Sequence, residues 1–180
     1  MANAWLFRGT QRVQGRKRII HQYNTGLEFL RYGRIILEKG GSAIDVSSQD
    51  EEIGFLCLNG NGMIQVDGKV YNLNKYDALY LPRESQCTIS SKGTFDMAEI
   101  AAPSSKKYPV QFVKFEDLKK DPDLVKQAGF EPYARTLNTV IGEKNVKASR
   151  LLAGVTFSKD GNWTSWPPHD HSKEKEEIYV

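Results

Sequence analysis

The sequence predicts an all-β protein, built as a sandwich or barrel of short antiparallel strands. Three observations carry this prediction. Apolar runs of strand length recur along the chain, and residues that favour tight turns separate them at intervals of about 8–12 residues, a spacing typical of sandwiches and barrels. The composition also suits a globular chain, with 39% hydrophobic and 26% charged residues.

The first series of predicted strands ends at residue 102. In chain order these strands span residues 32–37, 43–46, 53–58, 63–66, 70–73, 78–81, 87–89 and 96–102. The strongest turn signals are Asn59-Gly60-Asn61-Gly62 and Asp67-Gly68, because Asn and Gly tolerate a positive φ. Residues 1–26 carry few signals. We therefore expect a first barrel over residues 1–102.

A change of composition at Pro103 ends this series. Residues 103–132 indicate a linker that holds one or two short helices within 115–128. Asp121 is the expected N-cap of one helix and Pro122 its first residue, a position where the missing N–H of proline costs nothing.

Strand patterns then return, and we assign residues 133–180 to the start of a second barrel. The predicted strands are 136–141 and 151–157, with a turn at Asp160-Gly161 and a last apolar run at 177–180. The chain stops within that run, as if a longer protein had been cut.

Charge and composition argue against nucleic-acid binding and leave a cytoplasmic protein as the default expectation. The formal net charge of +3 comes from scattered lysines and arginines, and no nucleic-acid-binding motif accompanies them. No apolar stretch approaches the roughly 18 residues of a membrane-spanning helix, and no signal peptide is evident. Cys57 and Cys87 lie in apolar strand-like runs, so we expect buried free thiols.

The chemistry-bearing pattern is Pro167-Pro168-His169-Asp170-His171. In a strand, residues i and i+2 point to the same face, about 7 Å apart, so two imidazoles placed in this way can bind one metal ion. A carboxylate from the acidic stretch that follows, Glu174, Glu176 or Glu177, would add an oxygen ligand. The alternative is a solvated surface loop in which His-x-His occurs by chance.

Gly161, the His-x-His pair and a glutamate that leads into Ile178-Tyr179-Val180 together resemble the first metal motif of the cupin superfamily. More narrowly, the chain resembles the 5-deoxy-glucuronate isomerase and 5-keto-4-deoxyuronate isomerase family. The stretches that carry this resemblance are Gly161-Asn162-Trp163, Glu176-Glu177-Ile178-Tyr179, Gly60-Asn61-Gly62, Asp77-Ala78-Leu79-Tyr80, Ala101-Ala102-Pro103, Tyr108-Pro109 and Arg135-Thr136-Leu137-Asn138.

The resemblance implies a bicupin, two jelly-roll barrels in tandem, with the second barrel cut short here. The first barrel has no histidine between Gly26 and Pro168, so it would be a degenerate barrel without metal ligands. In the second barrel, His169, His171 and a glutamate would bind a divalent metal, zinc first and manganese or iron as alternatives. Glu177 is preferred to Glu176 because it directly precedes the Ile-Tyr strand, and a register slip would turn its side chain to the other face. The family's fourth ligand, a later histidine, is not in this sequence, and His21 is expected to be a surface or packing residue.

The activity implied is aldose–ketose isomerisation of a uronate sugar in inositol or pectin catabolism, most nearly that of a 5-deoxy-glucuronate isomerase. Whichever of Glu176 and Glu177 is not a ligand would be the proton-shuttling base. Arg135 would pair with the substrate carboxylate, and Trp163 and Trp166 would wall the sugar pocket. The alternative is a non-catalytic cupin that binds sugar or metal or serves in assembly, and a homo-oligomer is possible.

Overall fold

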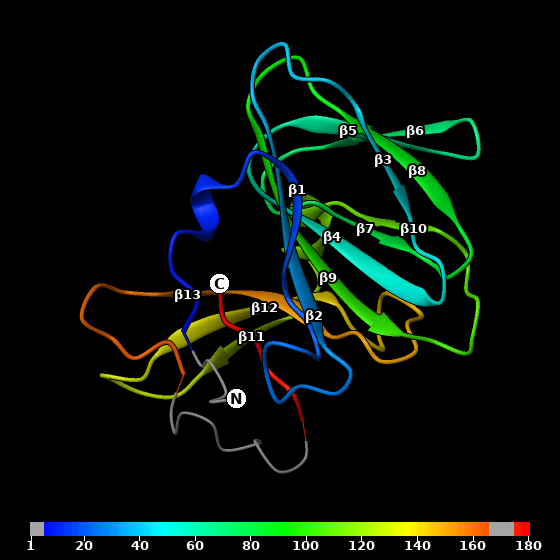
Figure 1. Ribbon diagram of the computed structural model, residues 1–180. Helices are drawn as coiled ribbons and strands as arrows, with labels where there is room; N and C mark the ends of the chain where they lie inside the picture. The colour runs from blue at the N-terminus through cyan, green and yellow to red at the C-terminus, as the bar shows by residue number, and fades with distance from the viewer. Residues whose placement is uncertain (1–5, 166–174) are drawn as a thin grey trace.

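The computed structural model describes residues 6–165 and 175–180, and its regular structure is almost entirely β (Figure 1). Its two short helices are η1 (Thr10–Arg12) and α1 (Phe115–Leu118). Its strands are β1 (Gly15–Ile20), β2 (Arg31–Leu37), β3 (Ile44–Ser47), β4 (Glu51–Gly60), β5 (Gly62–Val66), β6 (Lys69–Leu73), β7 (Ala78–Leu81), β8 (Gln86–Ser90), β9 (Phe95–Pro103), β10 (Gln111–Val113), β11 (Val125–Ala128), β12 (Arg135–Ile141) and β13 (Ala153–Ser158). The prediction of an all-β protein is confirmed.

Two sheets enclose the main core. A six-stranded sheet, in the order β1-β2-β9-β4-β7-β10, packs against a four-stranded sheet, in the order β3-β8-β5-β6. Alternate residues of each strand point into the space between them, so β4 contributes Ile53, Phe55 and Cys57 to the core, each with 0% exposure. The intervening β4 residues point away from this core, toward the rest of the chain.

The predicted turn at Asn59–Gly62 is the β4–β5 connection, and it needs its glycines. Gly60 has a φ of 75°, and a Cβ there would lie 1.9 Å from the carbonyl oxygen of Thr94. A Cβ on Gly62 would lie 2.2 Å from the ring of Phe95. Only glycine lets the two strands approach the Thr94–Phe95 backbone and ring so closely.

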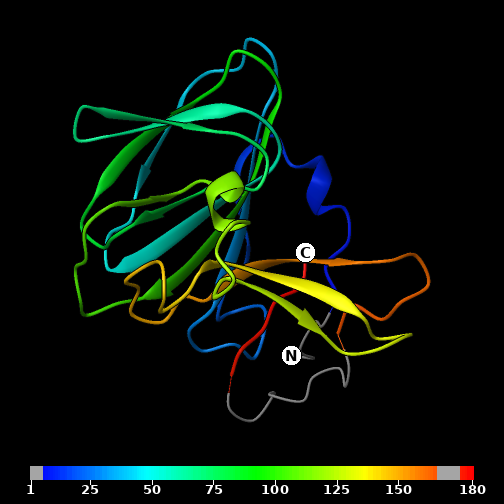
Figure 2. The ribbon, with the colours of Figure 1, turned by 180° about the vertical axis from the view of Figure 1, so that it is seen from behind.

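A separate three-stranded sheet, β11-β12-β13, covers part of the outer face of the six-stranded sheet (Figures 1 and 2). Leu56 and Ala98 of the barrel pack with Val140 of β12 and with Phe115 and Leu118 of α1. The segment 103–132 thus supplies β10 to the barrel sheet and β11 to the smaller sheet. The chain that leads to the His-x-His pair therefore leaves from a sheet that is packed on the barrel.

Most strand predictions match the observed strands within a few residues, and both cysteines are buried and free as expected. Strands β1, β10 and β11 are not predicted, and β11 lies within the range 115–128 for which the sequence indicates short helices. The predicted helix start at Asp121 and Pro122 is wrong: the helix begins at Phe115, and Asp121 opens a turn in which its carboxylate accepts the N–H of Asp123 at 2.9 Å. Burial of Phe115 and Leu118 decides the helix position. The last apolar run, 177–180, forms no strand with the described residues.

Candidate metal centre

The sequence-predicted site falls partly within the described chain. Trp166, His169 and His171 lie outside the described residues, as does Glu174. Arg135, Trp163, Glu176 and Glu177 lie within them. Across residues 6–165 and 175–180, no three His, Cys, Asp or Glu side chains come together in a way that would hold a metal ion.

The chain segments on either side of residues 166–174 meet at Tyr179. The hydroxyl oxygens of Tyr179 and Ser165 are 3.1 Å apart, and the Tyr179 hydroxyl donates to the carboxylate of Glu177 at 3.3 Å. Tyr179 thus links Ser165, which precedes residues 166–174 in the sequence, to Glu177, which follows them.

Exposure alternates along residues 175–179. Glu176 and Ile178 are half-buried, whereas Glu177 and Tyr179 are exposed. Glu176 and Ile178 thus face the protein, whereas the side chains of Glu177 and Tyr179 are exposed, that of Tyr179 beside Ser165.

The carboxylate of Glu176 is already engaged. It accepts hydrogen bonds from the backbone N–H groups of Glu28, Phe29 and Leu30 at 2.5, 2.9 and 2.6 Å. Ile178 packs beside it, against the apolar cluster between the barrel and the smaller sheet. The contacts of the two adjacent glutamates therefore differ. Glu176 accepts hydrogen bonds from the backbone of the first barrel, and Glu177 accepts one from the hydroxyl of Tyr179.

Arg135 and Trp163 lie at one corner of the three-stranded sheet. Arg135 begins β12, opposite Ser158 of β13, and its Nη1 donates to the carbonyl oxygen of Tyr133 at 3.0 Å. The backbone N–H of Trp163 donates to the carbonyl of Pro132 at 2.9 Å, and the side chain is 54% exposed. The loop after β13 is thus tied to the chain that enters β12, in which Arg135 is the first strand residue.

The comparisons with known proteins bear on the whole chain. The model of the KduI/IolB family matches residues 5–180. The chain belongs to the KduI/IolB family. It is 26% identical over 153 residues to the 4-deoxy-L-threo-5-hexosulose-uronate ketol-isomerase of Opitutus terrae, which is 79% of this chain and 52% of that protein. It is 22% identical over 169 residues to the 5-deoxy-glucuronate isomerase of Bacillus subtilis, which is 87% of this chain and 60% of that protein.

This member of the KduI/IolB family thus spans little more than half the length of these curated relatives. Among solved structures, an IolB-like protein from Salmonella typhimurium is similar with a TM-score of 0.73 and 17% identity, over 86% of this chain and 60% of that one. The predicted family and the predicted cupin-type fold are confirmed. A second barrel beginning at residue 133 stays a prediction.

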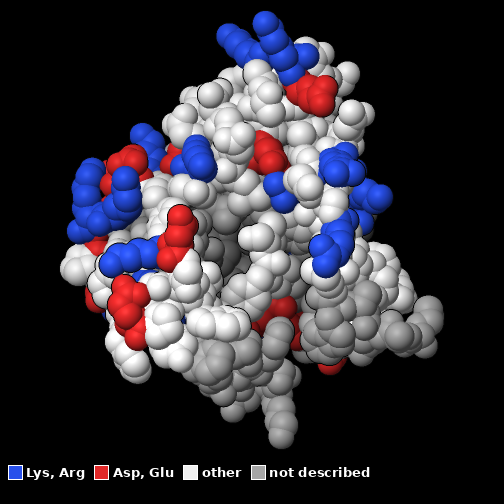
Figure 3. Space-filling view, turned by 90° about the vertical axis from the view of Figure 1, so that its left-hand side faces the viewer, with Lys and Arg blue, Asp and Glu red and all other residues white. Residues whose placement is uncertain are grey.

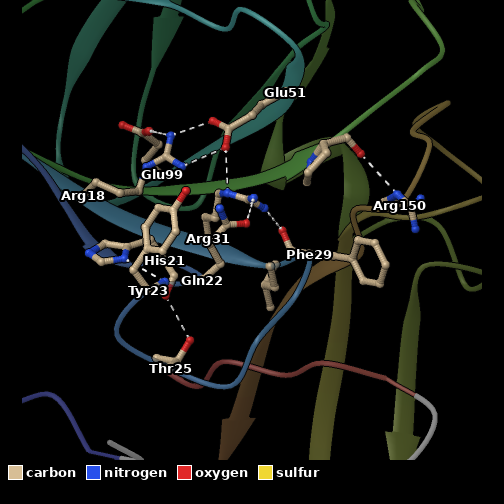
Figure 4. A network of polar contacts seen from close by, with 12 residues as sticks. Arg18, His21, Gln22, Tyr23, Thr25, Phe29, Arg31, Glu51, Glu99 and Arg150 are labelled. Atoms are coloured by element: carbon tan, nitrogen blue, oxygen red, sulfur yellow. Dashed lines mark hydrogen bonds and ion pairs between the residues drawn. The ribbon is translucent and has the colours of Figure 1, made fainter. Parts of the chain in front are cut away.

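In this KduI/IolB chain the interior of the first barrel holds an ion-pair cluster that the sequence did not reveal (Figure 4). Arg16 makes two hydrogen bonds to Glu99, at 2.7 and 2.8 Å, and Arg18 joins Glu99 to Glu51. Arg31 contacts Glu51 at 3.0 Å and donates to the carbonyl of Phe29. Burial alone would raise the pKa of Glu99, but the hydrogen bonds and charges of Arg16 and Arg18 hold it below its ordinary value.

Two surface properties complete the description of this KduI/IolB chain. On the face that Figure 3 shows, basic and acidic groups are interspersed around a largely uncharged hollow. None of the helices in the described ranges has the length and apolar character needed to span a membrane. His21 lies on the first barrel, where its Nδ1 accepts the N–H of Tyr23 at 3.2 Å.

Proposed function

We propose that this chain is part of a metal-assisted sugar-uronate isomerase of the aldose–ketose type, most nearly a 5-deoxy-glucuronate isomerase. Membership of a family whose curated relatives are named as uronate isomerases supports this assignment. The single observation that supports the site is the difference in contacts between the two glutamates that follow the His-x-His pair in the sequence: backbone N–H groups occupy the Glu176 carboxylate, whereas Glu177 is exposed and accepts the Tyr179 hydroxyl.

The donor set suits a divalent transition metal. Two imidazoles and one carboxylate, from His169, His171 and Glu177, are the ligand types that Zn²⁺ takes in catalytic sites, and Mn²⁺ or Fe²⁺ also accept them. Support for Glu177 over Glu176 comes from contacts, since three N–H groups already occupy the Glu176 carboxylate. When bound, such a metal supplies Lewis acidity at a sugar carbonyl and stabilises the negative charge of an enediolate.

Side chains at the corner of the three-stranded sheet where β12 begins would bind the sugar. Arg135 presents a guanidinium fork that matches a uronate carboxylate, and one of its nitrogens is already oriented by Tyr133. The exposed ring of Trp163 would cover one side of the substrate, with Trp166 as its proposed counterpart. Moving a proton between adjacent carbons also needs a base. The base would be whichever of Glu176 and Glu177 is not a ligand; with Glu177 as ligand this is Glu176, although its hydrogen bonds leave its carboxylate less free to accept a proton.

Metal content and turnover, measured together, test this proposal. The protein should hold one divalent metal per site, and His169→Ala should remove it, while His21→Ala, the change of a histidine in the first barrel, should leave it in place. Turnover of 5-deoxy-glucuronate or 4-deoxy-L-threo-5-hexosulose-uronate would support the isomerase. Metal without turnover would favour a sugar-binding or assembly module, and protein purified without metal would exclude the site. A cytoplasmic location, a homo-oligomer and the absence of nucleic-acid and membrane partners stay predictions.

A further inference from the structure

Residues 175–180 are held on the first barrel by two side chains, one polar and one apolar. Glu176 receives the N–H groups of three consecutive residues, Glu28, Phe29 and Leu30. Ile178 packs in the apolar cluster that also contains Leu27. The docked segment and the loop that receives it lie 148 residues apart in the sequence, so this contact joins distant parts of the chain.

The receiving loop is itself fixed from two directions (Figure 4). Arg31 donates to the carbonyl of Phe29 and also contacts Glu51 inside the barrel. On the other side, the guanidinium of Arg150 lies 4.3 Å from the centre of the Phe29 ring, and its Nε donates to the carbonyl of Pro103 at 3.1 Å. The three N–H groups are therefore presented by a braced backbone rather than by a free loop.

Exposure alternates from residue 175 to residue 179, so the docking of Glu176 and Ile178 leaves the side chain of Glu177 on the opposite, exposed side. Its carboxylate accepts the hydroxyl of Tyr179 at 3.3 Å, and that hydroxyl lies 3.1 Å from the hydroxyl of Ser165. A shift of one residue would exchange the two glutamates and place an apolar side chain in solvent.

We propose that Glu176 is a positioning residue: by docking on the N–H groups of residues 28–30 it uses the first barrel to hold Glu177 in place as the third metal ligand. The inference rests on the metal centre proposed above and deepens it. It gives the first barrel a role in a site to which it contributes no ligand.

Two measurements on the same variants test this inference. In the first, amide hydrogen exchange of Glu28, Phe29 and Leu30 is followed by NMR in the absence of metal. Glu176→Ala should speed exchange at these amides about tenfold or more, as expected when a charge-assisted hydrogen bond is lost. Glu176→Gln, which keeps the shape but loses the charge, should give an intermediate rate. Glu177→Ala is the matched control and should leave the three amides protected.

In the second measurement, Co²⁺ replaces the metal and its absorption bands report the ligand set. Glu176→Ala should weaken Co²⁺ binding about tenfold, as the loss of a residue that orients a ligand typically does, with unchanged band positions. Glu177→Ala should alter or abolish the bands. Altered bands in Glu176→Ala would make Glu176 itself a ligand and overturn the inference, as would unchanged amide exchange. If the unaltered protein binds no Co²⁺, the metal centre fails, and the exchange data alone still decide whether Glu176 docks the segment.

Discussion

The hydroxyl of Tyr80 donates to the carboxylate of Glu52 at 2.8 Å, with both side chains buried between the barrel and the chain that precedes β13. Glu52 also accepts the backbone N–H groups of Ser149, Arg150 and Leu151 at 2.7, 2.6 and 3.1 Å. A glutamate of the barrel thus holds the later part of the chain, just as Glu176 of the later part holds the barrel. Two carboxylates, each bound to three consecutive N–H groups, join the parts of this molecule.

Tyr80→Phe should destabilise the protein because it removes one donor from a buried carboxylate. Hydrogen bonds to charged groups contribute about 1.5–3 kcal/mol, so we expect a loss of that size in the free energy of unfolding, measured by urea titration. Tyr71→Phe is the control, since Tyr71 is only partly buried, and it should change stability by less than about 0.5 kcal/mol. Equal stabilities for the two variants would show that the Glu52–Tyr80 bond contributes nothing.

Gly60→Ala should be far more damaging than Gly68→Ala, although both residues have a positive φ, of 75° and 78°. At Gly68 nothing lies within 4 Å of an added Cβ, so only backbone strain of about 1–2 kcal/mol applies. At Gly60 the added atom meets the Thr94 carbonyl at 1.9 Å, and the β4–β5 turn must move. Thermal unfolding of both variants measures the difference. A similar fall in melting temperature for both would contradict the packing described at this turn.

The ion pairs of Glu99 should support the fold at neutral pH and fail in acid. The folded-state pKa of Glu99 lies below its ordinary value of 4.5, despite a burial that opposes ionisation, because of Arg16 and Arg18. A lowered pKa contributes stability above the unfolded-state value, and this contribution is lost as the pH falls through the folded-state value. Unfolding free energies of the native protein should therefore fall more steeply below about pH 4.5 than those of Glu99→Gln. Parallel curves would exclude this role.

Both cysteines should be inert to thiol reagents in the folded protein. Burial raises the pKa of Cys57 and of Cys87 to about 12, so almost no thiolate forms near pH 8. Iodoacetamide labelling followed by mass spectrometry should modify neither residue in native protein and both in urea. Rapid labelling of Cys87 under native conditions would show that the barrel opens.

Much of the barrel could be predicted because the strands and the turns between them are marked by local sequence patterns. The run Ile53–Leu58 ends in two Asn-Gly pairs, and the turn chemistry alone separates β4 from β5. Strand β1 lacks such a pattern, since Arg16-Lys17-Arg18 resembles a solvated charge cluster. Its arginines point into the barrel only because Glu99, far along the chain, is there to receive them.

The candidate site also combines local features, which the sequence shows, with contacts between distant residues, which it does not show. The His169-x-His171 spacing and the following glutamates are local, so the metal motif could be proposed from the sequence alone. The contacts that distinguish Glu176 from Glu177 are not local, because they depend on N–H groups of residues 28–30. No sequence pattern around Glu176 predicts that these N–H groups bind its carboxylate.

The central claim is a metal bound by His169, His171 and Glu177, and X-ray absorption at the zinc edge tests it most directly. With zinc-loaded protein the account predicts nitrogen and oxygen neighbours at about 2.0–2.2 Å, with the outer-shell pattern of two imidazoles, and one imidazole fewer in His169→Ala. Protein that retains no zinc would contradict the account. So would sulfur neighbours at about 2.3 Å, which would assign the metal to Cys57 or Cys87.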